Sequence, residues 1–394
     1  MQYSTIVRGT FKNPPARREK IQLKRAFFLF VTKSSYGTLG SKVELIGGER
    51  MKIVKDGQLK QICVEILRKF GADDEEASIV ADNLVKANLR GIDSHGVIRL
   101  KVYVDRLKNK TILPGASIRI TRETPSTALI DGGFGFGQVI AVKAIKIAIE
   151  KAKKTGVGGV GVFNTNHFGM LAYFALIAMQ EDMISLITTN GSPYVVPWGG
   201  RVPMLGTNPI CIGIPSSQEI PIILDMATSA AARGKIEKAA REGTKIPADW
   251  AVDEEGRPTT DPVAALKGAL LPFGGPKGYG LSFVIDILSG CLTGAAFGKH
   301  VVSLYPENAK SSLGHFILVI NPDAFIPIKE FKAAVARAVQ EIKSCPTMPG
   351  VSEVLVPGEI EYRTEQKRLR EGIPMSEETW RIIEGLCKET GVKI

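Results

Sequence analysis

Short apolar runs alternate with stretches of helical periodicity from Met51 to the C-terminus, and this alternation constrains the fold more than any other feature. Apolar runs of roughly four to eight residues bounded by Gly, Pro or Asn are typical of buried strands, whereas apolar residues spaced three and four apart indicate amphipathic helices. Residues 157–163, 184–188 and 210–214 are of the first kind, and residues 138–154 are of the second. The pattern predicts an α/β protein.

The first fifty residues do not share this pattern. They show no sustained periodicity, and they hold ten Lys and Arg against three Glu, a net +7 of the chain's +11. A short secretory signal or an Arg-rich targeting peptide would fit in part. We favour a third interpretation, in which Gly47-Gly48-Glu49-Arg50 is a translated ribosome-binding stretch and Met51 is the true start. We expect residues 1–50 to be an unstructured extension or a wrongly placed start.

Composition excludes several classes of protein. The five cysteines are scattered and form no CxxC pair, so the sequence encodes neither a disulfide framework nor a zinc site, which fits a reducing cytoplasm. No apolar run approaches the roughly 20 residues that span a bilayer. After residue 50 the net charge is +4, which does not indicate a nucleic-acid partner. We expect a soluble cytoplasmic protein that binds no metal, nucleic acid or membrane.

The segment 93–99, Asp-Ser-His-Gly-Val-Ile-Arg, carries the first candidate chemistry. Oxidation of a hydroxy acid needs a base for the hydroxyl proton and a cation for the carboxylate. If a helix begins at Asp93 or Ser94, His95 and Arg99 lie one turn apart on one face, and Tyr103 lies one turn further on. An imidazole would then lie beside a guanidinium that binds a carboxylate with two bonds. A surface helix with an incidental His and Arg is the alternative.

Two further side chains follow predicted strands, where α/β folds place ligands. His167 comes directly after the strand that ends at Phe163, although it could simply pack within a turn. Asp225 ends the run 222–224 and could orient an imidazole, with helix capping as the alternative. We expect His300 and His315 to be structural.

Two glycine-rich segments resemble nucleotide-binding motifs without matching them. Residues 272–280 place Lys277 among four glycines and form a plausible cradle for a phosphate or carboxylate, but the Walker spacing is absent. Residues 133–138 follow a strand and open a helix, but the third glycine comes too early for a Rossmann fingerprint. A dinucleotide, if bound, is therefore bound by a different fold.

Taken together, these segments resemble the malate/L-lactate/L-sulfolactate dehydrogenase family, whose members depend on NAD(P) and differ from the Rossmann-type dehydrogenases. The similarity covers nearly all of residues 51–394. Residues 1–50 have no counterpart in it. Its motifs lie at residues 90–99, 166–169, 205–209, 224–229, 271–280 and 356–359.

The resemblance implies a homodimer and a particular domain order. A non-Rossmann nucleotide-binding α/β domain with a mixed sheet, residues 126–290, would interrupt a mainly helical domain. Residues 51–125 would form the first part of that helical domain, and residues 291–394 would pack back on it.

The resemblance also implies roles for single residues. His95 is the leading acid/base candidate and His167 its competitor, Arg99 and Tyr103 face the substrate, and Asp225 lies close to the reacting centre. At the position of Gly191 some members carry a hydroxyl side chain. The cofactor, NAD or NADP, is expected near Gly191, Asp225, Met226, Ala227, Pro276, Lys277, Gly278, Gly358 and Glu359.

The expected activity is interconversion of an L-2-hydroxycarboxylate, such as malate or L-sulfolactate, and its 2-oxo acid. A reductase of cyclic imino acids or sugar-derived keto acids is the alternative within enzymes. A non-catalytic basic binding protein is the alternative outside them.

Overall fold

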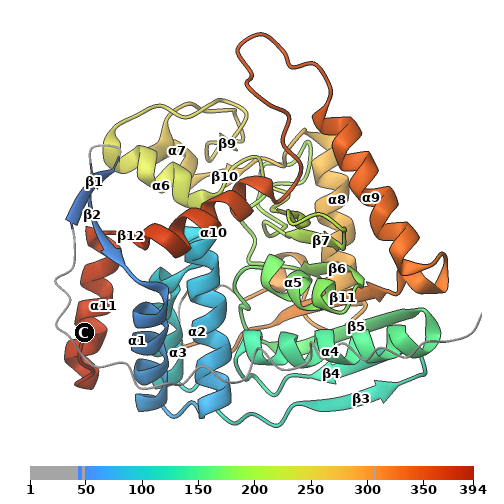
Figure 1. The fold of residues 1–394 in the computed structure, drawn as a ribbon. Coiled ribbons are helices and arrows are strands. Elements are labelled where there is room, and N and C mark those ends of the chain that lie inside the picture. Colours follow the sequence, from blue (N-terminus) through green and yellow to red (C-terminus); the bar gives the residue numbers. More distant parts are fainter. Residues whose placement is uncertain (1–42, 47–48, 303, 306–307) are drawn as a thin grey trace, which may run out of the picture. The chain divides into compact units, whose positions relative to one another are not determined.

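The computed structural model describes residues 43–46, 49–302, 304–305 and 308–394 (Figure 1). A seven-stranded sheet with the order β3-β4-β5-β11-β6-β7-β8 forms the centre of one domain. The β4–β5 pair is parallel and the other neighbours are antiparallel, so the sheet is mixed as expected. The strands are β3 (Arg119–Glu123), β4 (Thr127–Asp131), β5 (Val157–Thr165), β6 (Ile184–Thr189), β7 (Ile210–Ile214), β8 (Ile222–Met226) and β11 (Leu313–Ile320).

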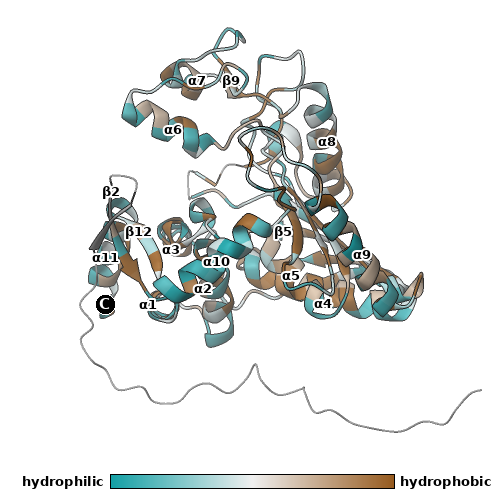
Figure 2. Cartoon of the chain, turned by 45° about the horizontal axis from the view of Figure 1, so that its top comes forward, coloured by the Kyte–Doolittle hydropathy of each residue, from teal (hydrophilic) through white to brown (hydrophobic). Residues whose placement is uncertain are grey.

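Helices α4 (Gly137–Thr155) and α5 (Ala172–Gln180) share one core with this sheet. The buried face of α4 consists of small and branched apolar residues such as Ile140, Ala144 and Ala148. Close approach also needs glycine on the strand, because a Cβ at Gly158 would lie 2.0 Å from the Ala148 carbonyl oxygen. Figure 2 colours β5 and α5 mainly as hydrophobic segments.

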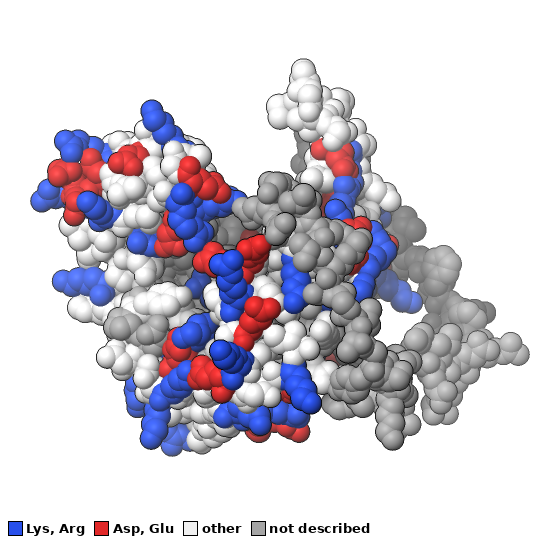
Figure 3. All heavy atoms as spheres, turned by 90° about the vertical axis from the view of Figure 1, so that its left-hand side faces the viewer, with Lys and Arg blue, Asp and Glu red and all other residues white. Residues whose placement is uncertain are grey.

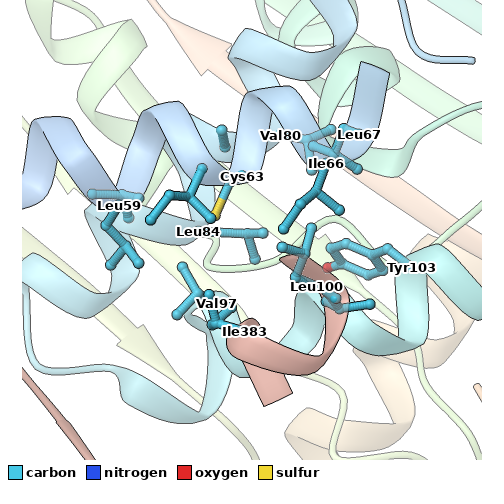
Figure 4. Packing of buried hydrophobic residues seen from close by; sticks show 14 of the residues in the cluster. Leu59, Cys63, Ile66, Leu67, Val80, Leu84, Val97, Leu100, Tyr103 and Ile383 are labelled. Atoms are coloured by element: carbon cyan, nitrogen blue, oxygen red, sulfur yellow. The ribbon is translucent and has the colours of Figure 1, made fainter. Parts of the chain in front are cut away.

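The second domain is mainly helical and is built from both ends of the chain, which confirms the expected architecture. It contains α1 (Asp56–Lys69), α2 (Asp74–Leu89), α3 (Leu100–Lys108), α10 (Glu359–Glu371) and α11 (Glu377–Thr390). Figure 4 shows its core, where Leu59, Ile66 and Leu84 pack against Ile383 of α11. Strand β2 (Glu49–Val54) pairs with β12 (Ile373–Ser376) and so joins the two ends.

The remaining helices and a short hairpin lie in the sequence between β8 and α10. Helices α6 (Arg233–Glu242) and α7 (Pro262–Lys267) pack with the hairpin β9 (Ala251–Val252) and β10 (Ala269–Leu270). Helices α8 (Pro276–Asp286) and α9 (Ile328–Lys343) follow this hairpin in the chain. On the face shown in Figure 3, Lys and Arg side chains are intermixed with Asp and Glu. None of the helices in the described ranges is long and apolar enough to cross a membrane.

Three expected boundaries differ from the structure. Strand β3 precedes residue 126 but pairs with β4, so the sheet domain begins earlier than predicted. Strand β11 lies between β5 and β6, which places residues 313–320 in the sheet rather than on the helical domain. Within the expected extension, β1 (Val43–Ile46) pairs with β2, so residues 43–46 and 49–50 are in strands. Residues 1–42 and 47–48 lie outside the described part of the chain.

Candidate active site

The turn that carries His95 is not the single helix that the sequence predicts. Two short 3-10 turns, Asp93–His95 and Val97–Arg99, precede α3, and extended backbone at Gly96 separates them. The cause is a tertiary contact, because the Asn88 side chain on α2 accepts the Val97 N–H at 2.8 Å. Val97 and Leu100 are buried in the helical core, which anchors the turn (Figure 4).

His95 and His167 lie together, although seventy-two positions separate them in the sequence. Their rings stack with centroids 5.6 Å apart and an interplanar angle of 20°. His167 lies in the loop that follows β5. The preceding residue, Asn166, fixes this loop because its Nδ2 donates to the Phe134 and Gly135 carbonyls at 3.0 and 2.9 Å. The two candidate histidines therefore belong to one site.

Tyr103 connects His167 to the protein interior. Its hydroxyl lies 2.8 Å from Nδ1 of His167, and Gln138 Nε2 donates to the same hydroxyl at 2.9 Å. Tyr103 is 1% exposed, and burial raises the pKa of its hydroxyl. Tyr103, which we expect to face the substrate together with Arg99, thus contacts the His167 imidazole and holds this ring in one orientation.

Both imidazoles are neutral at pH 7. Burial and, to a smaller extent, the nearby Arg99 guanidinium together lower the pKa of His95 to about 4. Burial also lowers the pKa of His167 well below its usual value, as do His95, Arg99, His315 and Arg106. A neutral imidazole can accept a proton, so the pair has the protonation state that a general base needs.

Arg99 supplies a positive charge next to this pair. Its Nε donates to the Ser94 carbonyl at 2.7 Å, and its Nη1 donates to the Tyr305 hydroxyl at 3.3 Å. These two bonds orient the guanidinium relative to the turn that carries His95. The planar group can still donate to a substrate carboxylate.

A pocket of about 510 Å³ adjoins the His95 turn. It is lined by His95, by Asp225, Met226 and Ala227 at the end of β8, and by Gly358 at the start of α10. These residues were expected to hold the cofactor or to lie at the reacting centre. The structure therefore brings the His95 motif and two of the expected cofactor segments to one cavity.

Asp225 does not orient an imidazole, which corrects the expectation for this side chain. Its Oδ2 accepts the Ala172 N–H at 2.8 Å, and among the described residues it makes no bond to either histidine. The carboxylate is open to solvent within the pocket but surrounded by protein. Burial raises its pKa to about 6, and nearby Glu361 adds to the rise, although the Ala172 N–H and Arg90 oppose it.

The other expected cofactor residues are not among those that line this pocket. The Gly191 N–H donates to Asn208 Oδ1 at 3.1 Å, and residues 276–278 form the first turn of α8. Glu359 is fully buried and accepts from Lys343 Nζ at 2.7 Å. Its carboxylate therefore anchors α10 to α9.

Three side chains near the site escaped sequence reasoning: Gln138, Arg106 and Tyr305. Gln138 lies in the segment that failed as a Rossmann fingerprint. Arg106 is fully buried and donates to Asn166 Oδ1 at 3.1 Å, and no local pattern marks a buried arginine on a helix. His315 is buried between two threonine hydroxyls and stacks on Phe168, as its expected structural role requires.

The chain matches known proteins over most of its length. The family model for malate/L-lactate dehydrogenase matches residues 54–384. The chain is 45% identical to the L-sulfolactate dehydrogenase of Methanothermobacter thermautotrophicus over 344 residues, which cover 87% of this chain and 98% of that protein. It is 43% identical to the malate dehydrogenase of Pyrococcus abyssi, with 87% and 96% covered.

Solved structures show the same fold. The sulfolactate dehydrogenase from Methanocaldococcus jannaschii superposes with a TM-score of 0.83 at 42% identity, over 86% of this chain and 98% of that one. The malate dehydrogenase from Entamoeba histolytica gives a TM-score of 0.84 at 39% identity, with 87% and 99% covered. The chain belongs to the malate/L-lactate dehydrogenase family.

Proposed function

We propose that this protein is an NAD(P)-dependent dehydrogenase that interconverts an L-2-hydroxycarboxylate, malate or L-sulfolactate, and its 2-oxo acid. The observation that carries the proposal is the neutral, stacked pair of His95 and His167 beside Arg99, next to a pocket lined by Asp225 and Gly358. A base, a carboxylate-binding cation and a cofactor cavity are the three parts that this reaction needs. The names of the similar proteins support the substrate class.

His167 is the acid/base group in this proposal. The Tyr103 hydroxyl, to which Gln138 donates, holds the His167 ring from the interior. The ring of His95, in contrast, bonds to the exposed Ser94 hydroxyl at 3.1 Å. A base whose partner holds it in one orientation transfers protons more effectively. His95 then lies against the pocket and shapes the place where substrate and cofactor meet.

The wall of the pocket is formed where α10 begins next to β8. The backbone at Gly358 has φ 87°, and a Cβ there would lie 3.0 Å from the backbone of Ile223, so glycine lets the start of α10 approach β8 closely. One oxygen of Asp225 binds the Ala172 N–H, which leaves the other for a ribose hydroxyl. NAD or NADP, when bound, supplies or accepts the hydride.

The test is a panel of 2-oxo acids with NADH and NADPH. We expect turnover of oxaloacetate or sulfopyruvate and quenching or shifting of NADH fluorescence on binding. Preferred reduction of a cyclic imino acid would reassign the substrate, and no NADH binding would refute an enzymatic role.

We also propose a cytoplasmic homodimer. Exposed apolar side chains gather in α8 and the turn after it, at Phe283, Val284, Ile287 and Leu292. A contiguous apolar surface of this kind is typical of subunit contacts. Light scattering should give twice the chain mass, and Val284→Glu should shift the protein toward monomer. A monomeric wild type would refute this.

A further inference from the structure

Helix α10 contacts the cofactor pocket at one end and the His95 turn further along. Its first residues, Ile360 and Glu361, line the pocket together with Gly358. Arg368, two turns later, binds Asp93 in the first 3-10 turn of the site. One rigid element thus touches the place where the cofactor is proposed to bind and the segment that carries a site histidine.

The contact between Arg368 and Asp93 is two-pronged. Nη1 donates to Oδ1 at 2.7 Å and Nη2 donates to Oδ2 at 3.1 Å, while Nη1 also donates to the Asn88 carbonyl. The Asn88 side chain donates to Asp93 Oδ1 at 2.6 Å. Donors from α10 and α2 therefore converge on one carboxylate, two positions before His95.

A second contact ties α10 to the pocket wall. Glu365 accepts from Lys86 Nζ at 2.7 Å and from Arg90 Nη1 at 3.1 Å. The Arg90 side chain is 1% exposed and the residue lines the pocket. Movement of α10 would consequently move both the wall of the pocket and the turn after it.

Folding stability alone does not account for the Arg368–Asp93 pair. The Asp93 side chain is 51% exposed and that of Arg368 is 15% exposed, and an ion pair with one half-exposed partner contributes only modestly to folding. Planar two-pronged pairs, in contrast, define orientation well. The pair is thus better suited to orienting the turn than to stabilising the protein.

We propose that Arg368 is a positioning residue for His95, acting through Asp93, and that α10 thereby couples occupancy of the cofactor pocket to the orientation of the His95 turn. This inference rests on the proposed function. Because coupling between two sites is reciprocal, cofactor should tighten binding of a substrate analogue, and the analogue should tighten binding of cofactor.

The first test compares Arg368→Met, Arg368→Lys and Asp93→Asn in the full-length protein. We expect Arg368→Met to lower kcat/KM by about 10-fold to 100-fold, mainly by raising KM, because displacement of a substrate-contacting group by about 1 Å has effects of this size. The dissociation constant of NADH without substrate should change less than about twofold. Arg368→Lys should restore part of kcat/KM. In a double-mutant cycle, Arg368→Met should add little to Asp93→Asn. Arg381→Met, which removes the exposed pair with Glu377, is the matched control.

The second test measures the coupling itself. The dissociation constant of hydroxymalonate, an unreactive malate analogue, is determined with and without saturating NADH. We expect NADH to tighten its binding to the wild type, and Arg368→Met to reduce this tightening by about threefold or more while the melting temperature stays near that of the Arg381→Met control.

Each outcome separates the two proposals. If the wild type turns over no 2-oxo acid, the proposed function fails. If the wild type is active and the coupling or the kcat/KM of Arg368→Met equals that of the control, the positioning role is overturned. If Arg368→Met melts at a lower temperature than the Arg381→Met control, Arg368→Lys, which keeps the positive charge, takes its place in the comparison.

Discussion

Replacing Gly96 with Ala tests how closely the His95 turn is held against α2. The backbone at Gly96 has φ −82°, so alanine is permitted there and the substitution adds only one methyl group. That methyl carbon would lie 2.2 Å from Asn88 Oδ1 and 2.4 Å from both Cγ and Nδ2. Asn88 is 2% exposed and its side chain bonds to Val97 and Asp93, so it has no free space into which it could move.

The geometry sets the size of the effect. Ordinary contact begins at 3.4 Å, so the turn and Asn88 must separate by roughly 1 Å. Overpacking of this kind typically costs about 1–3 kcal/mol of folding free energy. A shift of about 1 Å in the imidazole of His95 should reduce kcat/KM by up to about 100-fold, mainly by raising KM.

Stopped-flow or steady-state kinetics, NADH titration and thermal unfolding measure these effects together. Gly57→Ala is the matched control, because Gly57 lies in α1 and a Cβ there meets no atom within 4 Å. We expect the control to keep full activity and to gain about 0.5–1 kcal/mol from helix propensity. Wild-type kcat/KM and stability in Gly96→Ala would refute the tight contact and the positional argument built on it.

Three further predictions address single side chains. His167→Ala should lower kcat by about 100-fold or more with NADH still bound, whereas His95→Ala should mainly raise KM; the reverse pattern would transfer the acid/base role to His95. The pKa of Asp225 is raised to about 6, and in the proposed complex its ionised carboxylate accepts a hydrogen bond from a ribose hydroxyl. NADH affinity should therefore fall as pH drops through about 6, and Asp225→Asn should remove that pH dependence. Arg99→Lys should lower kcat/KM for the 2-hydroxy acid because lysine lacks the planar fork, and Arg99→Ala should erase the preference for an acid over the matching amide; unchanged discrimination would exclude Arg99 as the carboxylate clamp.

The sequence identified the residues of the His95 motif but not their conformation. Periodicity predicts one continuous helix over Asp93 to Leu107, and the apolar positions Val97, Leu100 and Val104 are indeed buried. The break at Gly96 arises because Asn88, on a different helix, takes the Val97 N–H that a continuous helix would bond internally. Such a tertiary contact leaves no trace in local patterning.

Contacts between distant segments also explain why the strand order of the sheet was not predicted. The five strands β4 to β8 are visible as apolar runs, whereas β3 is polar, and the position of β11 between β5 and β6 depends on pairing across more than a hundred residues. Local composition carries no information on such pairing. Buried Arg106 escaped for a related reason, since its bonds to Asn166 and to the carbonyls of Leu304 and Ala309 form only when three distant segments meet.

The electrostatics of the site indicate how one protein can work in both directions of the proposed reaction. Burial is the largest cause of the low pKa of both imidazoles, and the positive charge of Arg99 lowers both pKa values as well, while His95 also lowers that of His167. With the site empty, both rings stay neutral, and the pair is ready to accept the proton of a hydroxy acid. Reduction of a 2-oxo acid needs a proton on the pair instead. A substrate carboxylate on Arg99 offsets the guanidinium charge and so raises the affinity of the imidazoles for that proton. Arg99 therefore has two functions in the proposed mechanism: it binds the carboxylate, and through that carboxylate it links substrate binding to the protonation of His167.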